Sequence, residues 1–92
     1  MRGGTLPCVA YFVYLVECTD TTLYCGYTVD VEKRLKAHNA GKGSKYTRSR
    51  LPVKLVYVEK ISTKSAALKR EYAIKKMSRA QKKELFILRR VL

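Results

Sequence analysis

The chain has 92 residues, of which 47% are hydrophobic, and its 20 lysines and arginines against seven acidic residues give a formal net charge of +13. A chain of this length buries roughly 60–65% of its unfolded surface, so we expect one small globular domain rather than a disordered or multidomain protein. The longest apolar run has about ten residues, which is too short to span a membrane, and no secretory signal is recognisable, so we expect a cytoplasmic protein.

The first half of the chain predicts a β-hairpin followed by a helix. Residues 1–9 contain two glycines and a proline, and we expect a flexible lead-in to a single domain over residues 10–92. The β-branched and aromatic run Tyr11–Glu17 predicts a central strand covered on both faces, and Leu23–Thr28 predicts a second strand beyond a turn. Thr28 is the expected N-cap of the next helix.

That helix is predicted to run to about Ala40. Asp30 and Glu32 fall in its first turn, where the helix dipole favours acidic side chains, and Gly41 follows its end. The basic segment of residues 41–50 contains two glycines and predicts a loop.

The second half predicts one strand and two helices. Residues 53–61 alternate in polarity and predict a third strand, and Lys64–Met77 predicts a helix capped by Ser62 or Thr63. Ser78 is the expected cap of a last helix, about Arg79–Arg90. The order β-β-α-β-α-α predicts an α/β (α+β) fold in which helices flank a small three-stranded sheet, antiparallel or mixed.

The positive charge is concentrated beyond residue 32. Residues 1–32 hold one basic and four acidic residues, whereas residues 33–92 hold the other nineteen basic residues and three acidic ones. A field of this sign attracts polyanions, and nucleic acid is the first candidate. The alternative is a solvated basic surface that binds nothing.

The cysteine and histidine content argues against two kinds of site. Cys8, Cys18 and Cys25 are odd in number and contain no Cys-x-x-Cys pair, and His38 is the single histidine. This pattern argues against a disulfide framework and against a zinc site.

Two polar residues on the first predicted helix lie one turn apart. At 100° per residue, Val31 and Leu35 point to the core, and Arg34 and His38 lie at its edge, on the face nearest the sheet. The alternatives are an arginine that extends its stem over its own apolar stripe and a histidine that caps the helix or packs in the core.

Glu71 and the early tyrosines are also unusual. Glu71 lies among small apolar residues of its helix, so it is expected either to be paired or to bind a metal. Tyr14 and Tyr24 lie on the two hairpin strands, where packing is the simplest role for a tyrosine. Gly26 lies inside a strand, which predicts a bulge or a close approach of another group.

Together these residues resemble the GIY-YIG nuclease domain over about residues 10–78. Phe12-Val13-Tyr14 is a variant of the family's first motif, and Tyr24-Cys25-Gly26 is a variant of its second. Arg34, His38 and Glu71 follow in the family's order and approximate spacing. The chain looks most similar to the short stand-alone bacterial branch and to the catalytic domain of structure-specific resolvases.

The resemblance implies a divalent-metal-dependent endonuclease that hydrolyses phosphodiester bonds in DNA, in branched, flapped or single-stranded forms, during repair or recombination. It implies that Glu71 holds a single Mg²⁺ or Mn²⁺ ion and that Arg34 clamps the scissile phosphate. One of Tyr14 and Tyr24 would accept a proton from the attacking water, and His38 would bind phosphate or support a tyrosine.

The loop after the first helix is expected to bind nucleic acid. Lys45, Tyr46, Thr47 and Arg48 combine cations, an aromatic ring and a hydroxyl, as nucleic-acid grooves do.

The sequence departs from the family pattern at two places. The first motif lacks its glycine, and no asparagine of the kind that homing-type members carry follows Glu71.

No second DNA-binding domain is recognisable, so specificity would come from this surface or from a protein partner. Two alternatives stay open, namely a non-catalytic nucleic-acid-binding module and a nuclease subunit that is inactive without its partner. Neither a small-molecule cofactor nor membrane association is expected.

Overall fold

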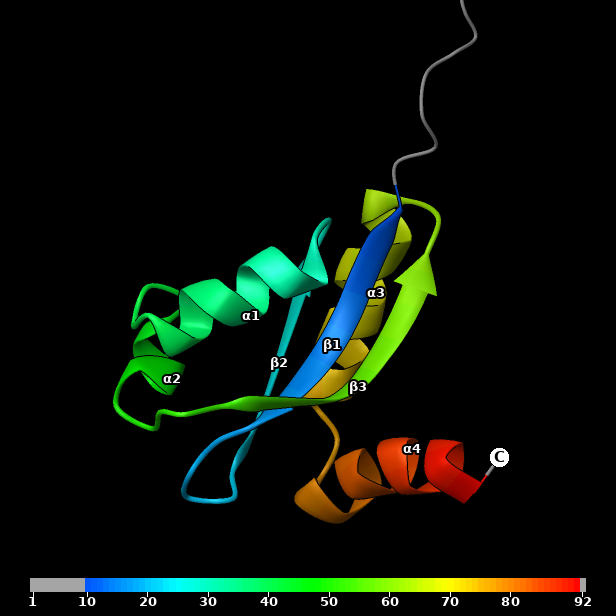
Figure 1. Cartoon of the computed structure of the whole chain (residues 1–92). Helices are drawn as coiled ribbons and strands as arrows, with labels where there is room; N and C mark the ends of the chain where they lie inside the picture. The colour runs from blue at the N-terminus through cyan, green and yellow to red at the C-terminus, as the bar shows by residue number, and fades with distance from the viewer. Residues whose placement is uncertain (1–9, 92) are drawn as a thin grey trace, which may run out of the picture.

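The computed structural model describes residues 10–91, and it describes the side chains of residues 10–87. The lead-in expected over residues 1–9 lies outside this range. The elements in chain order are β1 (Tyr11–Glu17), β2 (Leu23–Thr28), α1 (Val31–Asn39), α2 (Lys45–Arg48), β3 (Lys54–Ile61), α3 (Lys64–Lys75) and α4 (Arg79–Val91), as Figure 1 shows. The predicted fold class is confirmed, and α2 is an addition within the segment that was expected to be a loop.

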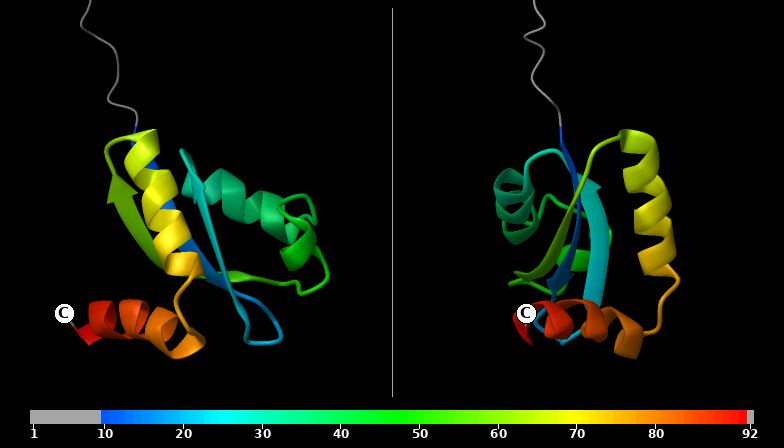
Figure 2. Two further views of the ribbon diagram at one scale, coloured as in Figure 1. Left: turned by 180° about the vertical axis from the view of Figure 1, so that it is seen from behind. Right: turned by 90° about the vertical axis from the view of Figure 1, so that its right-hand side faces the viewer.

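The sheet is antiparallel throughout, with the strand order β2-β1-β3. In the central strand β1, Val13 and Leu15 face one side, Tyr14 and Val16 face the other, and all four are buried. The prediction of a central strand covered on both faces is therefore confirmed. Figure 2 shows that α1 covers one face of the sheet and α3 covers the other.

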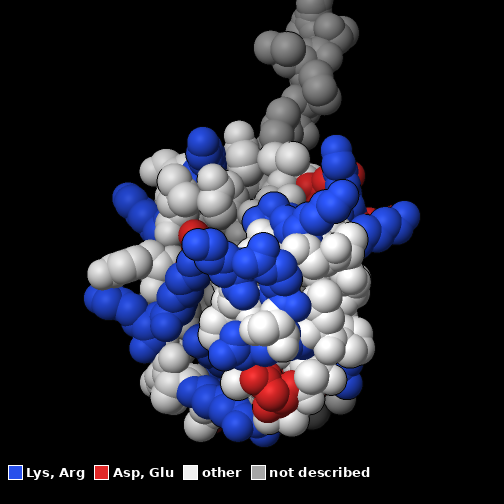
Figure 3. Space-filling view, turned by 90° about the vertical axis from the view of Figure 1, so that its left-hand side faces the viewer, with Lys and Arg blue, Asp and Glu red and all other residues white. Residues whose placement is uncertain are grey.

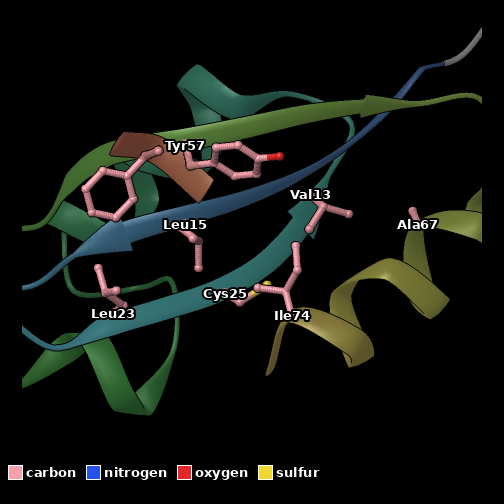
Figure 4. Packing of buried hydrophobic residues seen from close by; sticks show 8 residues of the cluster. Val13, Leu15, Leu23, Cys25, Tyr57, Ala67 and Ile74 are labelled. Atoms are coloured by element: carbon pink, nitrogen blue, oxygen red, sulfur yellow. The ribbon is translucent and has the colours of Figure 1, made fainter. Parts of the chain in front are cut away.

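The larger part of the core lies between the sheet and α3. Val13, Leu15 and Cys25 pack there against Ala67 and Ile74 of α3 (Figure 4). Burial, followed by the nearby Glu71 carboxylate, raises the pKa of the Cys25 thiol to about 12. A neutral buried thiol is a packing residue and not a nucleophile, as expected for Cys25.

The first helix begins two residues later than predicted. The Asp30 side chain caps α1 by accepting a hydrogen bond from the Lys33 N–H at 3.0 Å, whereas Thr28 is the last residue of β2. Gly41 has a φ of +80° and follows the end of the helix as expected.

The other boundaries lie close to the predicted ones. Thr63 caps α3 through the Ala66 N–H, and Ser78 exchanges two hydrogen bonds with Gln81 at the start of α4. The third strand begins at Lys54 because the backbone N–H and C=O of Val53 bond to the Asn39 side chain instead of to a strand. Within residues 10–91, no helix is long and apolar enough to cross a membrane.

Candidate active site

The imidazole of His38 is the buried centre of the candidate site. Its Nε2 lies 2.8 Å from the hydroxyl of Tyr14 on β1, and its Nδ1 lies 2.8 Å from Oγ1 of Thr47 in α2. The ring of Tyr24, from β2, packs edge-on against the imidazole with centroids 5.4 Å apart. Helical periodicity predicted that His38 lies at the edge of the core, but the residue is fully buried. The reason is that α2 covers the Nδ1 side of its ring.

Arg34 approaches the same hydroxyl from α1. Its Nε donates to Tyr14 Oη at 3.4 Å, and its Nη2 donates to the carbonyl oxygen of Gly43 at 3.2 Å. Acceptors from two different segments thus fix the direction of a half-buried guanidinium. The other N–H groups of Arg34 make no hydrogen bond to described residues, which leaves them available to an anion.

Two glycines leave the space that the site needs. A Cβ atom on Gly26 would lie 2.6 Å from Tyr14 Oη, and one on Gly43 would lie 2.1 Å from His38 Nδ1. The close approach predicted at Gly26 is therefore real, but the approaching group is the protein's own phenol. Sequence reasoning gave Gly43 no role, because its neighbour is 5 residues away in the chain and meets it only through the turn after α1.

Burial and charge set the protonation states of Tyr14 and His38. Burial raises the pKa of Tyr14, and the hydrogen bond and charge of Arg34 partly oppose this. Burial, followed by the charge of Arg34, lowers the pKa of His38. At neutral pH the phenol is therefore protonated and the imidazole is neutral, so that the imidazole can accept a proton.

The lowered pKa of His38 predicts a loss of stability in mild acid. Between the pKa of an unfolded histidine, about 6.5, and the lower folded pKa, only the unfolded chain binds the proton. The free energy of unfolding should therefore fall as the pH drops below about 6.5, by at most about 1.4 kcal/mol per pH unit.

Urea denaturation between pH 5 and 8 measures this effect. The variant His38→Gln should lose the pH dependence in this window. An identical slope in both proteins would assign the effect to other groups.

Glu71 lies on α3, on the other side of the sheet from α1 (Figure 2). Its Oε2 lies 3.5 Å from Nζ of Lys75, whose ammonium lies 6.0 Å from the centroid of the Tyr24 ring. Glu71 is therefore not in contact with Tyr14, Arg34 or His38, and the described contact that leads toward them runs through Lys75 to the ring of Tyr24 on the edge strand β2.

The residues present fit a magnesium-type ion held by few protein ligands. Among the described residues, no three His, Cys, Asp or Glu side chains cluster as a closed metal site would require. Mg²⁺ usually keeps several waters and takes one or two carboxylates together with substrate phosphates, and the partly buried carboxylate of Glu71 can supply that ligand. To bind the ion, the Glu71 carboxylate would have to give up its ion pair with Lys75.

The expected nucleic-acid segment is only partly exposed. Lys45, Tyr46 and Arg48 are exposed on α2, and the Tyr46 ring stacks on Tyr24 with centroids 5.8 Å apart. Thr47 is fully buried and bonds to His38, so the expectation of a direct contact between its side chain and nucleic acid is corrected. Figure 3 shows lysine and arginine side chains over the side of the molecule where α1 and α2 lie.

Sequence reasoning also missed the residues that support this segment. Ser44 caps α2 by accepting from the Thr47 N–H, and the Arg50 guanidinium lies 4.0 Å from the centroid of the Tyr46 ring. The spacing of a serine three residues before a threonine, directly after Gly43, was the available signal for a capped turn here.

Comparison with known proteins gives the family of the chain. The sequence-family model of the GIY-YIG catalytic domain matches residues 10–84 of this chain. A UPF0213 protein of Syntrophus aciditrophicus is 60% identical over 75 residues, which are 80% of this chain and 86% of the relative. A UPF0213 protein of Haloquadratum walsbyi is 56% identical over 75 residues, which are 82% of this chain and 84% of the relative.

Two NMR structures show the same fold. The UPF0213 protein BH0048 of Bacillus halodurans is 44% identical, with a TM-score of 0.56 over 86% of this chain and 84% of its own. The protein EF2693 of E. faecalis is 39% identical, with a TM-score of 0.62 over 90% of this chain and 88% of its own. The chain therefore belongs to the GIY-YIG nuclease family, among the stand-alone UPF0213 proteins.

Proposed function

We propose that this protein is a divalent-metal-dependent endonuclease that hydrolyses phosphodiester bonds in DNA. One observation carries the proposal, namely that Arg34 and His38 both converge on the hydroxyl of Tyr14. A phosphate-binding cation, a phenol and a neutral imidazole in contact are the groups that can bind a phosphodiester and activate water beside it.

Arg34 would hold the scissile phosphate with the N–H groups that the protein leaves free. The attacking water would give a proton to the Tyr14 oxygen while the phenolic proton passes to Nε2 of His38. The new P–O bond forms as the ester P–O bond breaks, and the leaving oxygen takes a proton from solvent. This relay avoids a free phenolate, which the raised pKa of Tyr14 opposes.

Glu71 would hold the Mg²⁺ or Mn²⁺ ion. When bound, such an ion neutralises charge on the phosphate and on the leaving oxygen. Because Glu71 and Arg34 lie on opposite sides of β2, the phosphodiester would cross this edge strand beside Tyr24. Lys75, once released from Glu71, would be free to bind a neighbouring phosphate.

Cleavage of labelled single-stranded, duplex, flap and four-way-junction DNA tests the proposal. We expect products with Mg²⁺ or Mn²⁺ and none with EDTA, and the ranking of substrates reports whether branched DNA, as in repair or recombination, is preferred. Salt-sensitive binding without cleavage would favour the non-catalytic module. Cleavage that appears only after a protein partner is added would favour the incomplete subunit.

The exposed cations of α2 should contribute to binding independently of cleavage. Replacing both Lys45 and Arg48 with alanine should weaken DNA binding and reduce the slope of log K against log salt by about two, since each phosphate contact adds about one. Fluorescence anisotropy in EDTA between 50 and 300 mM salt measures this slope. The matched control is the double variant Lys60→Ala/Lys64→Ala, whose exposed cations lie at the end of β3 and the start of α3.

An equal reduction of the slope in the two double variants would show that the whole basic surface, and not α2, attracts DNA. An unchanged slope with Lys45 and Arg48 replaced would remove α2 from the interface.

A further inference from the structure

We propose that Thr47 is a positioning residue for this reaction, because its buried hydroxyl accepts the Nδ1–H of His38 and so leaves Nε2 to receive the Tyr14 proton. The catalytic consequence rests on the proposed nuclease function. Which ring nitrogen of His38 carries the proton, its tautomer, is a property of the free protein and can be measured without substrate.

The polar groups form one buried line from the sheet to α2. Tyr14 Oη lies 2.8 Å from His38 Nε2, and Thr47 Oγ1 lies 2.8 Å from His38 Nδ1. Beyond it, Thr47 Oγ1 lies 3.4 Å from the backbone carbonyl oxygen of Ser44 and 3.0 Å from the Ser44 hydroxyl. Tyr14, His38 and Thr47 are all at most 2% exposed, so in the free protein their hydrogen bonds are made with one another and not with bulk water.

Two proton arrangements fit these distances, and only one satisfies every donor. In the first, Tyr14 donates to Nε2, Nδ1–H donates to Thr47, and Thr47 donates to the Ser44 carbonyl oxygen. In the second, Nε2–H donates to Tyr14 Oη, which already accepts from Nε of Arg34. The phenolic proton of Tyr14 then has no acceptor among the described residues.

An unpaired buried donor is penalised enough to favour the first arrangement by about tenfold or more. The first arrangement also suits the reaction. Nε2 presents its lone pair to the Tyr14 proton, and after the transfer Nδ1–H still donates to Thr47, so no group has to rotate. A hydrogen bond to a charged donor is stronger than one to a neutral donor, so Thr47 makes Nε2 more basic.

Among the residues that the structure describes, Arg34 is the charged group that acts on the ring. Tyr14 faces His38 from β1, Tyr24 from β2 and Thr47 from α2, and Arg34 of α1 supplies the positive charge that acts on it. Gly43 lets the start of α2 approach Nδ1, since a Cβ there would overlap the ring. Within the described part of the chain, Thr47 is thus the neutral acceptor that His38 Nδ1 contacts on the side of the ring away from Tyr14.

The test uses the fact that the chain has one histidine. In protein labelled with ¹⁵N-histidine, two-dimensional NMR at neutral pH should show a protonated Nδ1 and an unprotonated Nε2. The variant Thr47→Val, which keeps the shape but lacks the hydroxyl, should lower the proton affinity of His38 about tenfold. Thr47→Ser should restore it. Under single-turnover conditions Thr47→Val should also cleave about tenfold more slowly with unchanged DNA affinity, and Thr47→Ser should cleave within about twofold of wild type.

A protonated Nε2 in the wild-type protein would overturn the proposal by itself and needs no variant, so an unfolded Thr47→Val would not protect it. A folded Thr47→Val with wild-type proton affinity and cleavage would also overturn it. If the wild-type protein does not cleave DNA, the proposed function fails, and the NMR measurements still decide the tautomer.

Discussion

Replacing Glu71 with glutamine is expected to abolish metal-dependent cleavage while leaving the fold and DNA binding intact. The change removes the charge of the carboxylate that we propose as the metal ligand and preserves the shape of the side chain. A bound metal contributes several kcal/mol to stabilising a phosphoryl transition state, so we expect a loss of about a thousandfold in rate. Single-turnover cleavage of the preferred substrate in Mg²⁺ measures it.

The fold should tolerate this substitution. The pair Glu71–Lys75 spans one helical turn with Lys75 about half exposed, and such pairs contribute only about 0.3–0.5 kcal/mol. The matched control is Glu84→Gln, which removes an exposed carboxylate of α4 and should cleave like the wild type. Cleavage by Glu71→Gln at the wild-type rate would mean a contaminating nuclease or a different metal ligand.

The sequence was sufficient for the features that depend on local patterns. The hairpin and the central position of Tyr11–Glu17 follow from an apolar, β-branched run and the turn after it, the caps at Thr63 and Ser78 follow from capping chemistry, and the structure confirms them. The first helix cap was wrong because Thr28 and Asp30 are equally good caps locally. Pairing of Thr28 with Phe12 in the sheet decides between them.

The site required contacts that no local pattern contains. A four-residue helix has no hydrophobic period, so α2 could not be distinguished from a loop, and the roles of Thr47 and Gly43 follow only from its position over His38. The family resemblance grouped Arg34, His38 and Glu71 but did not show that Glu71 lies on the other side of the sheet from Arg34. The pair that Glu71 forms with Lys75 is one of the two roles that its place among apolar residues predicted.

Replacing Tyr14 with phenylalanine is expected to reduce cleavage about a hundredfold to ten-thousandfold, which is the usual contribution of a proton-transfer group. Arg34 and His38 both form a hydrogen bond with this hydroxyl, so its removal breaks the connection between the guanidinium that would bind phosphate and the imidazole. The ring stays in the core, and DNA binding in EDTA should be unchanged. Single-turnover rates at several pH values measure the effect.

Tyr24→Phe is the matched comparison, because the two tyrosines are the two candidates for the group that accepts the proton of water. The Tyr24 hydroxyl makes no hydrogen bond to described residues, and its ring contacts His38, Tyr46 and Lys75 without it. We therefore expect a smaller loss for Tyr24→Phe than for Tyr14→Phe. The opposite ranking would make Tyr24 the general base and would assign Tyr14 and His38 to holding Arg34 in place, because a buried phenol that can be removed without cost does not carry the proton.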